Sequence, residues 1–497
     1  MRTSSSCRAA ILVAVAVFAL APSLSAQGRP AAPPRALPDA CTDTTAAAKS
    51  RVEACRARVK ASRDDAAARE ALGQALLAAE EYGDAAEELE RAVKLQPARL
   101  RAWAALRDAY LGRDAEDDAR RAVERALEAN PDSAGAHGLL ARWLLNDEEY
   151  DSALVHIRHA LARQPRDPGL HDLRGDILHG NDDDKAAMAA YREALRLDPA
   201  HRGGHLGIAM LLRQQKKFAE AIPHYDAVIR ANPKDVWPSR QKAEALASLG
   251  RVPDGEKVLE ALVKADPQND ETHFQLADFL TDRDKDAESL PHYREAVRLD
   301  PTDATNHHDY GAAMARLEQF EPALAEYRET IRLAPRFLKA YGNAFDALVS
   351  LKRVDEALRM ADEWRKVAPR GSADPYAARG LALRLLDRDD DAIQSLDQAL
   401  ERDSTHLLAL VNRGIVRLGQ EDYARADRDA ASLIRLAPDR PNGHMLAGFV
   451  ALAQDRCGDV VRHWSAVNRM DAGWTERDAN VRKAFAKCRR EGSKSRN

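Results

Sequence analysis

Aromatic residues are scarce in this sequence. Phe, Trp and Tyr make up 5 % of the 497 residues, although hydrophobic residues together reach 45 %. Small residues such as alanine must supply much of that share, which favours thin, closely packed helices. An excess of positive charge is also missing, because 75 Lys and Arg face 79 Asp and Glu. This balance disfavours nucleic acid as a partner.

Long apolar runs are missing too, apart from Ala9–Ala21. Arg2 and Arg8 precede this run, and Pro22 with small residues up to Ala26 follows it, as in a secretory signal peptide. The run is short for a membrane span, although an uncleaved anchor is the alternative. We therefore expect residues 1–26 to be a signal peptide, no transmembrane segment after its removal, and a bacterial protein that is periplasmic or secreted.

Motifs of catalysis are absent from the sequence. It contains no His-Glu-x-x-His, no Gly-x-Ser-x-Gly, no phosphate loop and no Gly-x-Gly-x-x-Gly after a strand. The acidic runs Asp182–Asp184 and Asp389–Asp391 fall in expected turns, where solvated carboxylates are common. We therefore predict no catalytic residues, no metal site and no cofactor, and a protein that is not an enzyme.

A ladder of prolines is the dominant pattern that is present. Nine prolines recur every 34 residues, and after a shift of one residue Ser404 takes the proline's place before Pro438 resumes the series. Such a period is the signature of a stacked repeat array. The nine are Pro97, Pro131, Pro165, Pro199, Pro233, Pro267, Pro301, Pro335 and Pro369.

Each repeat reads as two amphipathic helices. Between Ala134 and Pro165, apolar residues follow helical spacing in two segments, separated by the polar turn at residues 146–149. The proline ends the second helix. Two residues after it, a side chain able to cap the next helix recurs. These capping candidates are Ser133, Asp167, Asp235, Asn269 and Asp303.

The pattern resembles the tetratricopeptide repeat family over about residues 66–472. Leu72, Gly73, Ala85, Leu89 and Pro97 fill the family's positions 7, 8, 20, 24 and 32. Position 20 is small in eleven of twelve repeats, so the two helices can approach closely. The series is Ala85, Ala119, Ala153, Ala187, Ala221, Gly255, Ser289, Ala323, Ala357, Ala392, Ala426 and Val460.

The resemblance implies an all-α, right-handed superhelical solenoid of about 11–12 repeats. After the signal peptide we expect a Pro/Ala-rich linker at 27–43 and a capping helix at 44–65. Eleven repeats follow at 66–438, and a degenerate twelfth at 439–472. A second capping helix at 473–490 and a basic tail at 491–497 complete the chain. Capped ends suit an array whose terminal units would otherwise expose their core.

Four cysteines follow the expected signal peptide, and they could pair in three ways. Two lie at each end of the array, and a disulfide needs Cα atoms within about 7 Å. We therefore predict the pairs Cys41–Cys55 and Cys457–Cys488, with free thiols as the alternative.

Histidine recurs at repeat position 4, where the family places a bulky residue. Equivalent residues of neighbouring repeats are about 10 Å apart, the distance between packed helices, which is too far for one metal ion. We expect structural roles for His137, His171, His205, His273, His307 and His444.

In this family the concave groove lined by the first helices binds peptide segments, so the resemblance implies a scaffold or adaptor with a protein partner. The groove candidates are mildly acidic overall, which favours a basic or mixed-charge ligand. One alternative is a carbohydrate- or cell-wall-binding or regulatory solenoid of the cell envelope, for which exposed aromatics such as Phe274 and Trp237 would be needed. Another is a chaperone-like binder of exported proteins. The candidates are Asp172, Asp176, Arg240, Glu244, Phe274, Asp278, His308, Lys339, Asn343 and Asp346.

Overall fold

The computed structural model describes Cys41 and residues 47–494 and divides the chain after Asp183 into two compact units. The expected signal peptide and most of the expected linker lie outside the described residues. The first unit holds α1 (Ala48–Ala61), α2 (Ala66–Ala78), α3 (Tyr82–Leu95), α4 (Leu100–Leu111), α5 (Glu116–Ala129), α6 (Ala134–Asn146), α7 (Tyr150–Arg163) and α8 (Pro168–Gly180).

In the described part of the second unit, all secondary-structure elements are again helices joined by short turns. Its helices are α9 (Asp184–Leu197), α10 (Arg202–Gln214), α11 (Phe218–Ala231), α12 (Val236–Ser248), α13 (Val252–Ala265), α14 (Asp270–Thr281), α15 (Asp286–Leu299), α16 (Ala304–Arg316), α17 (Phe320–Leu333), α18 (Leu338–Ser350), α19 (Val354–Val367), α20 (Asp374–Leu385), α21 (Asp389–Arg402), α22 (Leu407–Gly419), α23 (Tyr423–Leu436), α24 (Asn442–Ala453), α25 (Cys457–Met470), α26 (Trp474–Arg477) and α27 (Ala479–Lys494).

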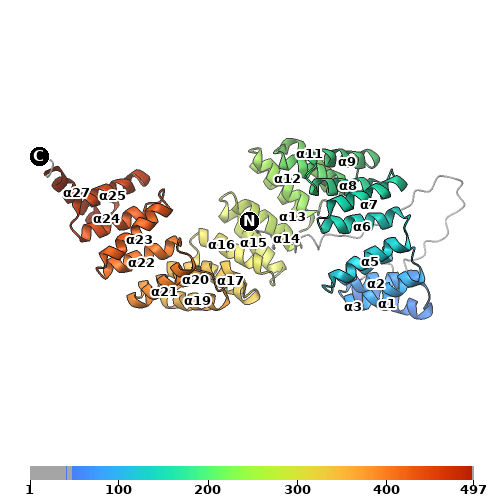
Figure 1. Ribbon diagram of the computed structural model, residues 1–497, viewed down its shortest axis with the longest axis horizontal. Coiled ribbons are helices and arrows are strands. Elements are labelled where there is room, and N and C mark those ends of the chain that lie inside the picture. Colours follow the sequence, from blue (N-terminus) through green and yellow to red (C-terminus); the bar gives the residue numbers. More distant parts are fainter. Residues whose placement is uncertain (1–40, 42–46, 495–497) are drawn as a thin grey trace. The chain divides into compact units, whose positions relative to one another are not determined.

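Within each unit, consecutive helices pack against each other (Figure 1), as an all-α repeat array requires. We call the first helix of a repeat its A helix, which has an even number from α2 to α24, and the second its B helix. The turn between A and B always places one residue in the left-handed region. In the first repeat this residue is Glu80, and the next N–H, that of Glu81, donates to the Leu76 carbonyl at 2.9 Å. This is the Schellman ending of a helix, and it fixes the sharp reversal.

Small residues hold the A and B helices close together. A Cβ atom built on Gly255, at position 20, would lie 2.8 Å from the Ala243 carbonyl oxygen of its A helix. One built on Gly311, at position 8, would lie 2.9 Å from the Tyr327 ring. The small side chains therefore set the packing distance, and the core consists of local clusters along the array.

The proline ladder has a second function besides ending the B helices. In seven repeats the side chain at position 4, six residues after the proline, donates a hydrogen bond to that proline's carbonyl oxygen. Trp103 donates to Pro97 at 2.9 Å, and Tyr341 donates to Pro335 at 3.2 Å. Histidines do the same in five repeats: His137, His171, His205, His273 and His307. Position 4 thus ties the start of one repeat to the end of the previous one.

The caps differ from expectation at one position. Ser133, Asp167, Asn269 and Asp303 accept hydrogen bonds from the first turn of the following helix, as predicted. Asp235 does not, because its carboxylate instead accepts from Arg202 at 2.7 and 3.0 Å. The charged partner outcompetes the backbone N–H groups.

The predicted C-terminal capping helix is broken. Asp478 has an extended backbone and separates α26 from α27, and its carboxylate accepts from the N–H groups of Asn480 and Val481. At the other end, α1 is shorter than the expected segment 44–65. None of the described helices has the length and hydropathy needed to cross a membrane.

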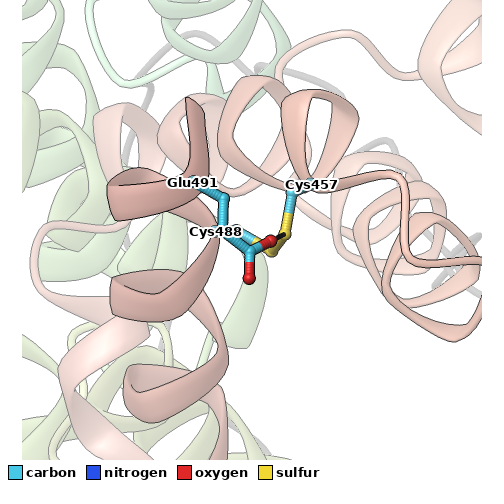
Figure 2. A group of neighbouring side chains, drawn as sticks. All are labelled: Cys457, Cys488 and Glu491. Carbon is cyan, nitrogen blue, oxygen red and sulfur yellow. Dashed lines mark hydrogen bonds between the residues drawn. A yellow bond between two sulfur atoms is a disulfide. The ribbon is translucent and has the colours of Figure 1, made fainter. Parts of the chain in front are cut away.

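Both expected cysteine pairs are disulfides in the structure. Cys41 and Cys55 have Cα atoms 4.7 Å apart, as do Cys457 and Cys488. Figure 2 shows how the second bond joins the start of α25 to α27. The Glu491 carboxylate lies 3.1 Å from the Cys457 sulfur. Because the two sulfurs are bonded to each other, this trio offers no thiolate ligand to a metal while the disulfide is intact.

Candidate functional site

The A helices α2 to α8 in the first unit and α12 to α24 in the second form a common face, because each contacts the next A helix. We call this surface of the second unit, from α12 to α24, the A face. It carries eight of the ten predicted groove residues, and Asp172 and Asp176 lie half-buried on α8 of the first unit.

The beginning of the A face is an internal ion-pair network. The Arg240 guanidinium lies 2.8 Å from Asp278, 3.1 Å from Glu244 and 3.3 Å from Asp282. Arg283 contacts the other oxygen of Glu244 at 2.8 Å. The two predicted groove residues Arg240 and Glu244 therefore neutralise each other and their neighbours. They link α12 to α14 and are not open to a ligand.

A line of carboxylates continues along α14, α16 and α18. Burial raises the pKa of Asp278, Arg240 opposes this shift, and the carboxylates of Asp282 and Asp309 add to it. Burial also raises the pKa of Tyr327 to about 12; Arg316 opposes that shift, while Asp346 and Asp309 add to it. Asp309 affects the pKa of both Asp278 and Tyr327, and Asp346 affects that of Tyr327. These neighbouring carboxylates give this stretch of the A face a negative potential.

The remaining predicted groove residues of the second unit lie on the same helices, α14, α16 and α18. His308 is buried, with its Nδ1 atom 2.6 Å from Asp309 and its Nε2 atom 3.1 Å from the Asn343 amide. Lys339 is exposed on α18. Phe274 is half-buried and meets Tyr293 edge-on, with the ring centroids 5.9 Å apart. Trp237 is 41 % exposed.

The sequence reasoning missed an apolar stretch further along the A face. On α22, Leu408 and Ile415 are 44 % and 40 % exposed and occupy the same repeat positions as Lys339 and Asp346. Val411, between them, corresponds to His308. A hollow of about 180 Å³ beside them is lined by Leu407, Leu408, Val411, Leu433 and Ala437, among others. Applying the groove positions to every repeat would have revealed this stretch.

The first unit contains a more polar hollow of about 490 Å³ between α1, α2 and α3. Its charges pair with one another: Arg69 contacts Glu88 at 2.5 Å, and Arg56 contacts Asp84 at 3.3 Å. This internal pairing makes it a weaker candidate than the A face.

Histidine pairs are a second feature that the sequence reasoning missed. In four repeats the position-4 histidine meets a B-helix histidine that lies 19 residues later in the sequence. The sequence prediction considered only equivalent histidines of neighbouring repeats, whereas the 19-residue spacing lies within a single repeat. The pairs are His137–His156, His205–His224, His273–His292 and His444–His463.

Sequence models agree with the repeat pattern. A family model described as "Tetratricopeptide repeat" matches residues 76–142, 110–177 and 212–281, and a second model with the same description matches residues 173–236. No curated protein sequence matches the chain significantly.

Three solved structures match the chain at low sequence identity. Cut9 in the APC/C hetero-tetramer Cut9–Hcn1 is 12 % identical, with 87 % of this chain and 98 % of that chain covered and a TM-score of 0.40. Yeast Tom70 is 14 % identical, with 87 % and 96 % covered and a TM-score of 0.39. YrrB, described as a TPR protein with an unusual peptide-binding site, is 20 % identical, with 37 % and 95 % covered and a TM-score of 0.33. All three TM-scores are below 0.5 and carry no argument, whereas the sequence models identify tetratricopeptide repeats over residues 76–281.

Proposed function

We propose that the chain, whose residues 76–281 match tetratricopeptide repeat models, is a protein-interaction scaffold that holds its partner on the A face of the second unit. The observation that carries this proposal is the change of chemistry along that face. Asp309 and Asp346 provide negative charge on α16 and α18, while Leu408 and Ile415 provide exposed apolar surface on α22.

This arrangement fits an extended protein segment that has basic residues at one end and apolar residues at the other. Lys and Arg would lie against the carboxylates, which gives orientation more than affinity. Apolar side chains would cover Leu408, Val411 and Ile415, and burying such surface yields about 25 cal/mol per Å². We propose no catalytic step, and the scaffold acts by holding its partner.

Synthetic peptides test this proposal directly. A fluorescent peptide with a Lys/Arg run followed by a Leu-rich run is titrated with the protein, and fluorescence anisotropy reports binding. We expect Asp346→Asn to weaken binding about fivefold, which corresponds to roughly 1 kcal/mol for one charge pair. The exposed Asp355 on α19 lies off the A face, and Asp355→Asn serves as the matched control. Equal effects of the two variants, or preference for a Glu-rich peptide, would reject the proposed surface.

We also propose that the protein works outside the cytoplasm. The layout of residues 1–26 supports export, and two disulfides suit an oxidising compartment. Cell fractionation followed by alkylation of free thiols tests this. Recovery in the cytoplasmic fraction with Cys457 and Cys488 alkylated would contradict it.

A further inference from the structure

The four histidine pairs share one geometry, although the residues around them differ. The Nδ1 atoms are 3.1 Å apart in His137–His156, 3.0 Å in His205–His224, 3.4 Å in His273–His292 and 3.0 Å in His444–His463. In each pair the first histidine is on an A helix and the second is on the B helix of the same repeat. The recurrence indicates a repeated local unit.

The proline carbonyl fixes the tautomer of the A-helix histidine in three of the pairs. His137, His205 and His273 each place Nε2 within 3.0 to 3.3 Å of a proline carbonyl oxygen. A carbonyl only accepts, so Nε2 carries the hydrogen, and the Nδ1 of the neutral ring presents its lone pair to the partner. Metal-binding histidines commonly donate their other N–H in this way.

The rings meet nearly end to end. Ring centroids are 5.2 Å apart in His205–His224, while the Nδ1 atoms are 3.0 Å apart, and the other pairs show a similar excess. The lone pair of one Nδ1 atom and the N–H bond of the other are therefore nearly in line, so the two nitrogens do not converge at a tetrahedral angle. Zn²⁺ needs about four converging ligands. Among the described residues, the one cluster of three or more potential ligands is Cys457, Cys488 and Glu491, so the pairs have no third protein ligand of these types.

We propose that each of the four pairs binds one monovalent d¹⁰ ion, Cu⁺ or Ag⁺, in linear coordination between its two Nδ1 atoms. Such ions accept two nitrogen donors in a line, and imidazole is a suitable ligand for copper. The ion replaces the Nδ1–H···Nδ1 hydrogen bond. The Nδ1 proton of the B-helix histidine moves to its own Nε2 through solvent, so no net proton is released and no redox change occurs.

The structure can accommodate the ion with a small adjustment. Two metal–nitrogen bonds of about 2 Å require an Nδ1–Nδ1 distance of about 4 Å, so each pair must open by roughly 0.6 to 1 Å. The B-helix histidines are half-buried, which leaves room for rotation toward solvent. Burial lowers the pKa of His156, His224, His292 and His463, which keeps these rings neutral and their lone pairs available at pH 7.

Two repeats whose position-4 histidine has no histidine partner 19 residues later serve as internal controls. His307 occupies the same position, but its Nδ1 atom meets the Glu326 carboxylate at 2.6 Å, and a carboxylate is a hard ligand that suits soft ions poorly. His171 also lies at position 4, and the residue 19 positions later in the sequence is Ala190. Both repeats should therefore bind no ion.

Native mass spectrometry of the full chain, with its disulfides intact, tests the stoichiometry. Ag⁺ is the probe because it does not cycle between oxidation states, and a Cys7→Ser background removes the remaining thiol. We expect four bound ions. His224→Gln should reduce this number by one, and replacing His156, His224, His292 and His463 together by Gln should abolish binding. Glu326→His should add one ion, whereas Glu326→Gln should add none.

Two results would overturn the inference. One is an ion count that is unchanged in the fourfold variant while circular dichroism shows a folded protein. The other is a wild-type protein that binds Zn²⁺ at these pairs and leaves Ag⁺ and Cu⁺ free. In either case, failure of Glu326→His to add an ion would show that the histidine pairs are hydrogen-bonded contacts only. The inference is independent of the proposed A-face function, because none of these histidines lies on that face's predicted ligand positions.

Discussion

Tyr341 donates its hydroxyl hydrogen to the carbonyl oxygen of Pro335, 3.2 Å away. The proline ends one repeat and the tyrosine begins the packing of the next, so this bond spans the joint between them. Trp103 and five histidines make the equivalent bond elsewhere, with three different kinds of donor. In these seven repeats position 4 therefore supplies a hydrogen-bond donor as well as bulk.

Removing the Tyr341 hydroxyl measures the contribution of this bond. We expect Tyr341→Phe to lower the free energy of unfolding by about 0.5–1.5 kcal/mol, since the proline carbonyl loses its partner while the ring packing is kept. Urea unfolding followed by circular dichroism checks the value. Tyr376 has the same position in the next repeat and is stacked under Arg402, whose guanidinium carbon lies 3.8 Å from the ring centroid. Tyr376→Phe is the control and should have little effect.

The left-handed residue between helices A and B has its own energetic cost. Gly250 is the glycine at this position, and a Cβ atom built on it would meet no atom within 4 Å. Gly250→Ala should therefore cost about 1 kcal/mol from backbone conformation alone. Gly83, inside α3, is also unobstructed, and Gly83→Ala should stabilise by roughly 0.5–1 kcal/mol. The Tm of Gly250→Ala should therefore fall below that of the wild type, and the Tm of Gly83→Ala should rise above it. Two Tm shifts of equal sign would contradict this explanation.

Acid should destabilise the fold in a defined pH window. Burial lowers the pKa of His156, His224, His292 and His463 below the value of about 6.5 for an unfolded chain. Below about pH 6.5 the unfolded chain binds protons that the folded protein does not, so the free energy of unfolding falls as pH drops through the folded pKa values. Above about pH 6.5 these four histidines do not make the free energy of unfolding depend on pH.

Replacing the four B-helix histidines by Gln should flatten this dependence. The difference in Tm between about pH 7.5 and about pH 5 is then expected to shrink by a few degrees. If the difference is the same in wild type and variant, the histidines are not responsible for the acid sensitivity.

The Cys457–Cys488 bond should stabilise the end of the array specifically. Cys488 and Phe485 are buried against Val460 and Trp464, so α27 covers the last helix pair. We expect Cys457→Ser with Cys488→Ser to cost about 2–4 kcal/mol of local stability. Hydrogen exchange should rise in α25–α27 and stay unchanged in α10–α19. Since each repeat contacts only its neighbours, uniform loss of protection would contradict the account.

The sequence was informative where a residue type has one structural consequence. Prolines at a fixed period follow the ends of most B helices, and small residues at position 20 such as Gly255 leave no room for larger ones. Competition between partners could not be predicted. Asp235 could cap a helix or bind Arg202, and the sequence does not rank these options. Arg240 and Glu244 were predicted correctly on the A helices, but their mutual neutralisation depends on Asp278 and Arg283 from the next repeat.

The claim that the A face binds a partner can be tested most directly in cells. A photo-crosslinking amino acid is introduced at Lys339 or at Ile415 on the A face, or at Arg332, whose side chain is 66 % exposed on the B helix α17. The account predicts that both A-face positions capture the same protein, that Arg332 does not, and that Asp346→Lys abolishes the capture. Capture from Arg332 alone, or capture that persists in Asp346→Lys, would contradict it.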